Sequence, residues 1–362
     1  MVYTITLIFS VFFAWLASRV KNKGVMILCS IISVLIPAII AGIRDRVGTD
    51  TMVYAIPDAM SAYTSQSFSE FVSVSLGAEP GYRLLCYVTM KTLGHPNWCL
   101  FFYQLITTGC FYIGAYKHRK IAPLPLLMLG FLCMYYVNSF NTMRQSMAVS
   151  IIFMGINNLE EKKYWRFMSY IIVAFTFHYS TIAVVALILI PHMIISRQSA
   201  YFKYFILGTL VMFLLFIRPI ITLAINLNQS IGLVPVKYTS YLDITQMHGK
   251  GDSFSITHLL VQLGTFLIFL FYPKGAEKRL GRCNVDFYKY NILLNLIFTH
   301  VAMLFFRLVA YNRIINVIPY AAMPYFVKDK YLKFFLIVML SISVLYALYR
   351  ASSEGLYRSI LD

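Results

Sequence analysis

The chain has 362 residues, of which 59% are hydrophobic and 12% are charged, with a formal net charge of +17 and a mean hydropathy of +0.71. Because soluble domains carry about 25% charged residues, this composition excludes an ordinary soluble protein. The basic residues lie between hydrophobic stretches, so they are expected to orient the chain in a membrane and not to bind nucleic acid.

Long apolar blocks recur along the chain, and they predict an all-α, polytopic integral membrane protein. A helix needs about 20 apolar residues to cross the hydrocarbon core of a bilayer. The first block, residues 2–17, is followed rather than preceded by basic residues, which is typical of a first span with an external N-terminus and not of a cleaved signal peptide. The further blocks with essentially no charge are residues 25–43, 121–137, 168–190, 204–225, 256–272, 292–306 and 334–348.

Basic turns between these blocks predict the topology through the positive-inside rule. The predicted cytoplasmic turns are 19–23, 117–120, 160–166, 197–203, 274–289 and 328–333, and the external segments are 41–80, 139–143, 226–253, 307–312 and the tail from residue 350. This topology gives about twelve crossings, provided that two of the segments do not cross the membrane as regular helices. Broken helices are tolerated within a membrane where they line a polar cavity. Residues 81–93 would form a re-entrant or interfacial helix, and residues 167–195 would enter and leave as two half-helices that meet near His178. We therefore predict one transmembrane domain over residues 1–362, with outer loops at about 42–80 and 226–253.

Arginine outnumbers lysine on the predicted external side, whereas lysine dominates the cytoplasmic turns. Arginine has a planar guanidinium group that grips phosphate through paired hydrogen bonds, while lysine suits simple orientation of the chain. Alternatively, these arginines snorkel, hold phospholipid headgroups, or pair with nearby carboxylates such as Asp45. The external arginines are Arg44, Arg46, Arg83, Arg144, Arg218, Arg307, Arg313, Arg350 and Arg358.

The segment GIRDRVGTDTMVY, residues 42–54, directly follows the second predicted span. It places two arginines and two aspartates between glycines, which let a backbone turn closely around a ligand. Arg44 and Arg46 are therefore candidates for clamping an anion, and Asp50 is a candidate for orienting the substrate. A solvated loop after a helix would carry similar charges but would not need glycines at both ends.

The segment NTMRQSMA, residues 141–148, is predicted to open a helix after an external turn. Arg144 then falls in or near the first helical turn, where free backbone N–H groups and the helix dipole already favour anions. A cation is unfavourable at this place unless an anion accompanies it. This mismatch makes Arg144 a candidate for a phosphate contact.

The segment FTFHYS, residues 175–180, carries His178 inside an otherwise apolar run. A histidine in such a run is often a structural residue with satisfied hydrogen bonds. Ionisable groups within membranes are costly, however, and usually serve a function, and the topology also requires a break here. His178 is therefore a candidate for a general base or for a donor to a phosphate oxygen.

Three weaker features add to these candidates. The segment EPGYRLL, residues 79–85, places Glu79 and Arg83 at the mouth of the predicted re-entrant helix. Arg307 and Arg313 flank an external turn. Tyr238 lies in the outer loop 226–253, where it would stack on a sugar ring or belong to the aromatic belt of the membrane interface.

The motifs that the chain lacks narrow its chemistry. It contains no P-loop, GxGxxG, HExxH or GxSxG motif and no metal-type cysteine pair. Its six cysteines are expected to be small buried hydrophobic residues. The cytoplasmic turns are also too short to house a nucleotide-binding domain. We therefore expect no metal ion, no other cofactor and no nucleotide-driven activity inside the cell.

Taken in order, the four motifs GIRDRVGTDTMVY, EPGYRLL, MRQSMA and FHYS resemble those of the EpsG family, which includes Wzy-type polymerases of O-antigen and exopolysaccharide. The resemblance implies a glycosyltransferase with a GT-C-like fold and no metal requirement. Its substrates would be oligosaccharide repeat units on undecaprenyl pyrophosphate, at the outer face of the bacterial inner (plasma) membrane. Its partners would then be these lipid-linked sugars and membrane lipids, and a chain-length regulator is a further candidate.

The chemistry of the candidate residues fits this implied reaction. Pyrophosphate is the leaving group, and fixed positive charge lowers the barrier where negative charge develops on its oxygen. Arg44, Arg46 and Arg144 would supply this charge, with Arg307 or Arg313 completing the clamp. His178 would activate the acceptor hydroxyl or contact phosphate, and Glu79, Asp45 and Asp50 are alternative bases or orienting partners. The predicted substrate-binding residues are Arg44, Arg46, Asp50, Arg83, Arg307, Arg313 and Tyr238.

Three other functions remain open from the sequence. A flippase for lipid-linked sugars needs polar groups along a path at mid-membrane depth, whereas the charges here are predicted at the outer boundary. An O-antigen ligase-like transferase would use the same donor and the same arginines. A membrane acyltransferase would also need a histidine, together with an entrance for acyl-CoA on the cytoplasmic side.

Overall fold

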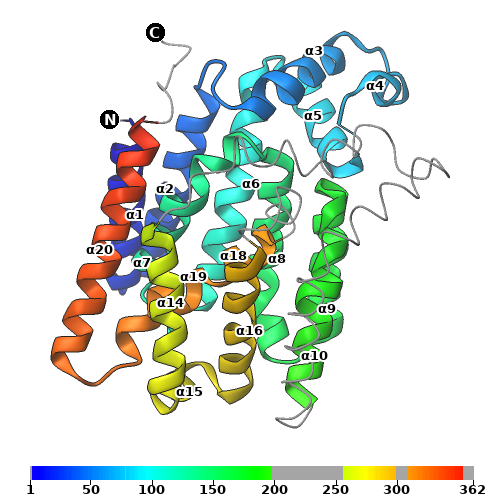
Figure 1. Ribbon diagram of the computed structural model, residues 1–362. Helices are drawn as coiled ribbons and strands as arrows, with labels where there is room; N and C mark the ends of the chain where they lie inside the picture. Colours follow the sequence, from blue (N-terminus) through cyan, green and yellow to red (C-terminus); the bar gives the residue numbers. More distant parts are fainter. Residues whose placement is uncertain (1, 78, 198–255, 299–308, 354–362) are drawn as a thin grey trace.

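The computed structural model describes residues 2–77, 79–197, 256–298 and 309–353, and every regular element within these ranges is a helix (Figure 1). The predicted outer loop 226–253 with Tyr238, the apolar block 204–225 and Arg307 lie outside the described residues. Of the described helices, 5 are long and apolar enough to cross a membrane, or 6 if a pair bent by 98° counts as one span. The chain is therefore a multi-pass, all-α membrane protein, whereas the total of about twelve crossings stays a prediction.

The chain opens with a helical hairpin whose arms are joined by serines. α1 (Val2–Arg19) and α2 (Lys23–Gly42) flank a basic turn, and the Asn22 side chain caps α2. Ser10 Oγ donates a hydrogen bond to the Ser33 carbonyl oxygen at 2.7 Å, and Ser33 Oγ donates to the Ser10 carbonyl at 2.8 Å. Small hydroxyl-bearing residues let helices approach closely in a membrane, so this pair fixes the hairpin.

Short helices lie within and directly after the segment that the sequence predicted as the outer loop 42–80. They lie at one end of the molecule (Figure 1). α4 forms there because Ser67 and Glu70 build a variant of the capping box: Ser67 Oγ accepts from the Glu70 N–H, and the Glu70 carboxylate accepts a second backbone N–H. The helices are α3 (Ile56–Thr64), α4 (Phe68–Val74) and α5 (Pro80–Leu93).

The length of α5 agrees with the predicted interfacial or re-entrant helix. Its 14 residues extend about 21 Å at 1.5 Å each, which is less than the roughly 30 Å of a bilayer core. Gly94 ends the helix in the left-handed conformation, with φ 71°. The helix therefore does not cross the membrane alone.

Closely packed helices form the centre of the bundle. Gly114 of α6 faces Phe153 of α8, and a Cβ at Gly114 would lie 2.6 Å from that ring. The rings of Phe111 and Phe131 stack at a centroid distance of 4.4 Å, and those of Phe111 and Phe153 at 4.3 Å. The central helices are α6 (Pro96–Lys117), α7 (Leu124–Phe131), α8 (Met143–Glu160), α16 (Arg282–Phe298), α18 (Ala310–Ile315) and α19 (Val317–Ala322).

The chain turns back on itself at His178, as the sequence predicts. α9 (Tyr164–Phe177) ends there in extended backbone, with φ −158° and ψ 120°, and the chain returns through irregular helical turns into α10 (Ile190–Arg197). The Tyr164 and Ser196 hydroxyl groups lie 2.9 Å apart, so the two far ends of this hairpin meet. The returning arm is longer than the predicted half-helix, because it reaches the length of a full span.

Those predicted cytoplasmic turns that the structure describes lie at the end opposite α3, α4 and α5 (Figure 1). Arg279 of α15 (Pro273–Leu280) donates to the Ile121 carbonyl oxygen at 3.2 Å, and Arg279 and Lys333 both lie over the Tyr325 ring. We call this end the basic end, and the opposite one the site end. Two further helices reach the basic end, α14 (Ile256–Phe271) and α20 (Lys330–Ser353).

Candidate functional site

Three of the segments singled out in the sequence meet at one carboxylate, that of Glu79. This residue directly precedes α5, and its side chain is only 5% exposed. Its Oε2 accepts a hydrogen bond from Arg144 Nη1 at 2.5 Å, and its Oε1 lies 3.0 Å from His178 Nδ1. Arg144 comes from the first turn of α8, and His178 from the break after α9. The fold therefore brings three distant parts of the chain into one site at the site end.

The environment of Glu79 lowers its pKa. Burial, the largest influence, raises the pKa, but the hydrogen bond from His178 and the charges of Arg144 and His178 together outweigh it. The pKa of Glu79 is thereby lowered from 4.5 to about 2. Because the carboxylate is ionised and both of its oxygens are engaged, it is suited to orienting its neighbours and is a poor proton acceptor.

The Glu79 carboxylate also determines which nitrogen of His178 carries a proton. An ionised carboxylate only accepts hydrogen bonds, so Nδ1 of His178 must be the donor between them. In the neutral ring, Nε2 is then an acceptor, and it makes no hydrogen bond within the described part of the chain. A carboxylate placed behind an imidazole in this way orients a general base in many enzymes.

Arg144 is held between aromatic rings. Its guanidinium carbon lies 4.3 Å from the centre of the Tyr54 ring and 5.4 Å from that of Tyr82, and Tyr82 stacks on Tyr103 at 5.3 Å. These cation–π contacts fix the plane of the guanidinium group. One nitrogen bonds to Glu79, whereas the buried Nε has no partner among the described residues. Because this Nε is buried and the side chain as a whole is 14% exposed, an oxyanion can approach the guanidinium only through its exposed part.

The loop that follows α2 docks on the loop that precedes α8. The Asp50 carboxylate accepts a hydrogen bond from the Met143 N–H at 2.9 Å, and the Thr49 N–H donates to the Asn141 side-chain oxygen at 2.9 Å. The segment GIRDRVGTDTMVY, residues 42–54, is therefore in contact with the segment NTMRQSMA, residues 141–148. Their junction determines where α8 begins, and with it the position of Arg144.

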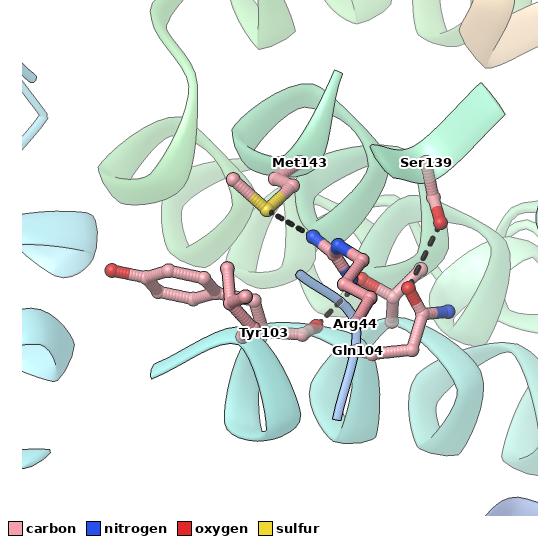
Figure 2. Close-up of a pocket in the computed structure, with 7 residues that line it drawn as sticks. Arg44, Tyr103, Gln104, Ser139 and Met143 are labelled. Carbon is pink, nitrogen blue, oxygen red and sulfur yellow. Dashed lines mark hydrogen bonds between the residues drawn. The ribbon is translucent and has the colours of Figure 1, made fainter. Parts of the chain in front are cut away.

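Arg44 braces the same junction from inside the protein. The side chain is 1% exposed, and its guanidinium donates to the Ala41 carbonyl at 2.9 Å, to the Val47 carbonyl at 3.2 Å and to Thr51 Oγ1 at 3.1 Å. It also donates to Met143 Sδ at 3.0 Å (Figure 2). These bonds engage the guanidinium within the protein. Arg44 therefore fixes the shape of the docked loop in this structure.

A narrow hollow lies beside Arg44 (Figure 2), and it leaves no room for a molecule the size of water. Ser139 and Gln104 form part of its wall, and Ser139 Oγ donates to Gln104 Oε1 at 2.9 Å. Ligand pockets usually exceed roughly 300 Å³, so the hollow is too small for a sugar residue. It belongs to the packed floor beneath the docked loop.

The other predicted site residues that the structure describes have separate surroundings. Arg46 is exposed and adopts a positive φ of 52°. Arg83 donates through Nε to the Gly77 carbonyl at 2.6 Å and so shapes the turn that leads to α5. Arg313 is partly buried in the last turn of α18.

Several residues that build the site were not predicted from the sequence. Asp58 is completely buried and accepts the backbone N–H groups of Leu76 at 2.6 Å and Gly77 at 3.0 Å, which holds the turn before α5. Its signal was a lone carboxylate in the first turn of a helix, next to a proline. Tyr54 and Tyr82 lie inside the motifs quoted from the sequence, but only the charged residues of those motifs were predicted to belong to the site.

Within the described ranges, no group of three or more histidine, cysteine, aspartate or glutamate side chains could hold a metal ion. A model of the EpsG family matches residues 27–359 of the chain. This match includes Glu79, Arg144 and His178. No curated protein and no solved structure is significantly similar to the chain.

Proposed function

The chain belongs to the EpsG family, which is associated with exopolysaccharide biosynthesis, and from this premise we propose that it is a polysaccharide polymerase. It joins oligosaccharide repeat units that are carried on undecaprenyl pyrophosphate, as Wzy-type enzymes do for O-antigen and exopolysaccharide. The observation that carries the proposal is the shared hydrogen bonding of Glu79 with Arg144 and His178.

His178 serves as the general base in this proposal. The acceptor hydroxyl of one repeat unit gives its proton to Nε2 of His178 while its oxygen bonds to the anomeric carbon of the growing chain. Glu79 holds the Nδ1 proton, keeps the ring in the required tautomer and stabilises the imidazolium that forms. The low pKa of Glu79 supports this orienting role.

Arg144 stabilises the leaving group. As the new bond forms, the bond between the anomeric carbon and the pyrophosphate oxygen breaks, and its electron pair departs with the pyrophosphate. The guanidinium, held by Tyr54 and Tyr82, and the N–H groups at the start of α8 supply positive charge at that oxygen. No divalent cation is needed for this step.

The remaining arginines take supporting roles. Arg44 positions the docked loop through its internal hydrogen bonds, and Arg83 shapes the turn that presents Glu79. Arg46 is exposed next to this loop and is placed to capture the carrier phosphates. Asp50 orients the start of α8 through the Met143 N–H. Further predicted substrate contacts are Arg307, Arg313 and Tyr238.

We further propose a single GT-C-like transmembrane domain over residues 1–362, with about twelve crossings and the site end facing the periplasm or the exterior. The gathering of the lysine-bearing turns at the opposite end supports this orientation, because such turns stay in the cytoplasm. The lipid-linked sugars then reach the site from the outer leaflet. A chain-length regulator is the protein partner that this reaction allows.

Turnover by the purified protein tests the proposal. The protein is incubated with undecaprenyl-pyrophosphate-linked repeat units and without added metal, and the products are separated on a gel. We expect a ladder of long chains from the wild type, and a loss of about 100- to 1,000-fold in rate for Arg144→Ala and for His178→Asn. Arg166→Ala, which removes an exposed arginine at the basic end, is the matched control and should keep the wild-type rate.

Surface polysaccharide in cells separates the rival functions. A polymerase defect leaves sugars of a single repeat unit on the cell surface, so this product is expected for Arg144→Ala at normal protein levels. Complete loss of the surface sugar would instead indicate a flippase or a ligase. Normal long chains in both Arg144→Ala and His178→Asn would refute the site.

A further inference from the structure

α16 carries a polar face along the inside of the bundle. Asn284, Tyr288, Asn291 and Asn295 follow one another at the spacing of a single helix face. Tyr288, Asn291 and Asn295 are completely buried. Amides inside a membrane protein are costly unless they find hydrogen-bond partners, so this face requires an explanation beyond packing.

α18 continues the polar face. Asn312 Nδ2 donates to Asn291 Oδ1 at 2.6 Å, and Asn295 Nδ2 donates to the Asn291 carbonyl at 3.1 Å. Asn316 follows one helical turn after Asn312, and both are 0% exposed. We call Asn291, Asn295, Asn312 and Asn316 the amide cluster.

Hydroxyl groups join the start of α18, which also carries Asn312, to the segment that carries His178. Tyr311, the neighbour of Asn312, has its hydroxyl 3.0 Å from Thr181 Oγ1 and 3.2 Å from Ser180 Oγ. Thr181 Oγ1 in turn donates to the His178 carbonyl at 2.7 Å. Since Ser180 is partly exposed, polar groups lead from the surface beside His178 into the core.

Several atoms of the amide cluster lack a partner within the described part of the chain. They are Asn291 Nδ2, Asn312 Oδ1 and both amide atoms of Asn316, although the Tyr320 hydroxyl approaches Asn316. Leaving one buried polar atom without a hydrogen bond costs about 1–3 kcal/mol. Polar sites of this kind are the places where proteins hold internal water.

The polar face ends in a different way toward the basic end. There the Tyr288 hydroxyl donates to Glu160 Oε1 at 2.6 Å, and Glu160 Oε2 lies 2.8 Å from His118 Nε2. His118 Nδ1 lies 2.7 Å from the Gly114 carbonyl. Both carboxylate oxygens and both ring nitrogens are thus engaged, and this network closes the polar face at that end.

We propose that the amide cluster binds water and forms a hydrated column inside the helical core, open at the site end beside Ser180 and closed at the basic end by Glu160 and His118. For the proposed transfer reaction, water and protons then reach the inner side of the His178 segment from the site end. That consequence rests on the proposed function, whereas the column itself does not depend on it.

Cysteine labelling tests the column independently of catalysis. In the full-length protein with its six native cysteines replaced, Asn312→Cys and Asn316→Cys are treated with a small, charged methanethiosulfonate that does not cross membranes. Ile292→Cys on α16 and Ile315→Cys on α18, which are equally buried, are the matched controls. We expect the asparagine positions to react at least about tenfold faster than these controls, and only from the site-end side of the membrane.

A stability measurement provides a second test, for the case in which a cysteine variant reacts slowly only because it folds poorly. Asn316→Leu keeps the side-chain size and removes the amide. If the core there were dry, the change would remove an unsatisfied group and raise the melting temperature; we expect no rise, because the bonds to water are lost. Labelling as slow as that of the controls, labelling from the basic end, or a raised melting temperature for Asn316→Leu would each overturn the proposal.

Discussion

Two arginines near the start of α8 have different surroundings, and their surroundings separate their roles. Arg44 is almost completely buried, and its guanidinium is engaged by Ala41, Thr51 and Met143. Arg144 bonds to Glu79 through one nitrogen and keeps its Nε without a partner in the described structure. An arginine whose donors are engaged stabilises a fold, whereas one with a spare donor at a partly open position can bind an anion.

Glu79→Gln should make the stability of the protein less sensitive to acid. The pKa of Glu79 is about 2 in the folded protein against 4.5 ordinarily, so its stabilising effect is present above pH 4.5 and is lost as the pH falls toward 2. The shift corresponds to about 3 kcal/mol at most. Thermal unfolding in detergent should therefore show a wild type that is more stable than the variant at pH 7, with the difference shrinking below pH 4.5.

Glu161→Gln is the control for that experiment, because Glu161 is an exposed carboxylate at the basic end. This variant should unfold at the wild-type temperature throughout the pH range. A constant difference between wild type and Glu79→Gln from pH 7 to pH 2 would show that the Glu79 carboxylate is not held ionised by its neighbours.

The docked loop depends on a glycine at its closest approach to the neighbouring segment. Gly48 adopts φ 96°, and a Cβ there would lie 2.4 Å from the Phe140 carbonyl oxygen. Both the backbone conformation and the contact therefore disfavour any side chain. Because Thr49 and Asp50 follow directly and bind the loop before α8, a shift at Gly48 moves the start of α8.

Gly48→Ala should destabilise the protein by about 1–3 kcal/mol and should lower the rate of the proposed polymerisation further than the loss of folded protein explains. Gly94→Ala is the matched control: Gly94 also has a positive φ, 71°, but a Cβ there meets nothing within 4 Å. Melting temperature and turnover per folded molecule are measured for both. Equal effects of the two variants would mean that backbone strain alone matters and that the close contact with Phe140 does not.

At the scale of the whole molecule, the apolar blocks and the basic turns predicted a multi-pass helical protein, and the described residues confirm this. The break at His178 was also predicted, since the charge pattern required the chain to return there. The short helices α3 and α4 were missed because their first-turn signals, Pro57 and the pair of Ser67 with Glu70, lie in a polar stretch without long apolar periodicity.

The candidate site was predicted only in part. Charge and position in the sequence pointed to Glu79, Arg144 and His178, and the fold brings these three together. The sequence did not indicate that Arg44 is buried, because the number of hydrogen bonds to a guanidinium depends on tertiary contacts. The amide cluster was not predicted either, because asparagine is uncharged and the site was predicted from the positions of charged residues.

The orientation of the molecule gives its own prediction. In a protein without native cysteines, Gln66→Cys is exposed between α3 and α4 at the site end, and Lys163→Cys is exposed at the basic end. A membrane-impermeant maleimide should label the first in spheroplasts and the second only in inverted vesicles. Labelling of both cysteines from the same side would contradict the topology.

The hairpin that carries His178 makes the site mechanically sensitive. Its far ends are tied by the hydroxyl groups of Tyr164 and Ser196, while His178 stands at the tip. An arm of 14 residues is about 21 Å long, so a tilt of about 5° moves the tip by about 2 Å. That displacement is enough to break the contact of 3.0 Å with Glu79. Lipids of different acyl length, which tilt such helices, should therefore change the rate of the proposed transfer reaction by moving His178 relative to Glu79.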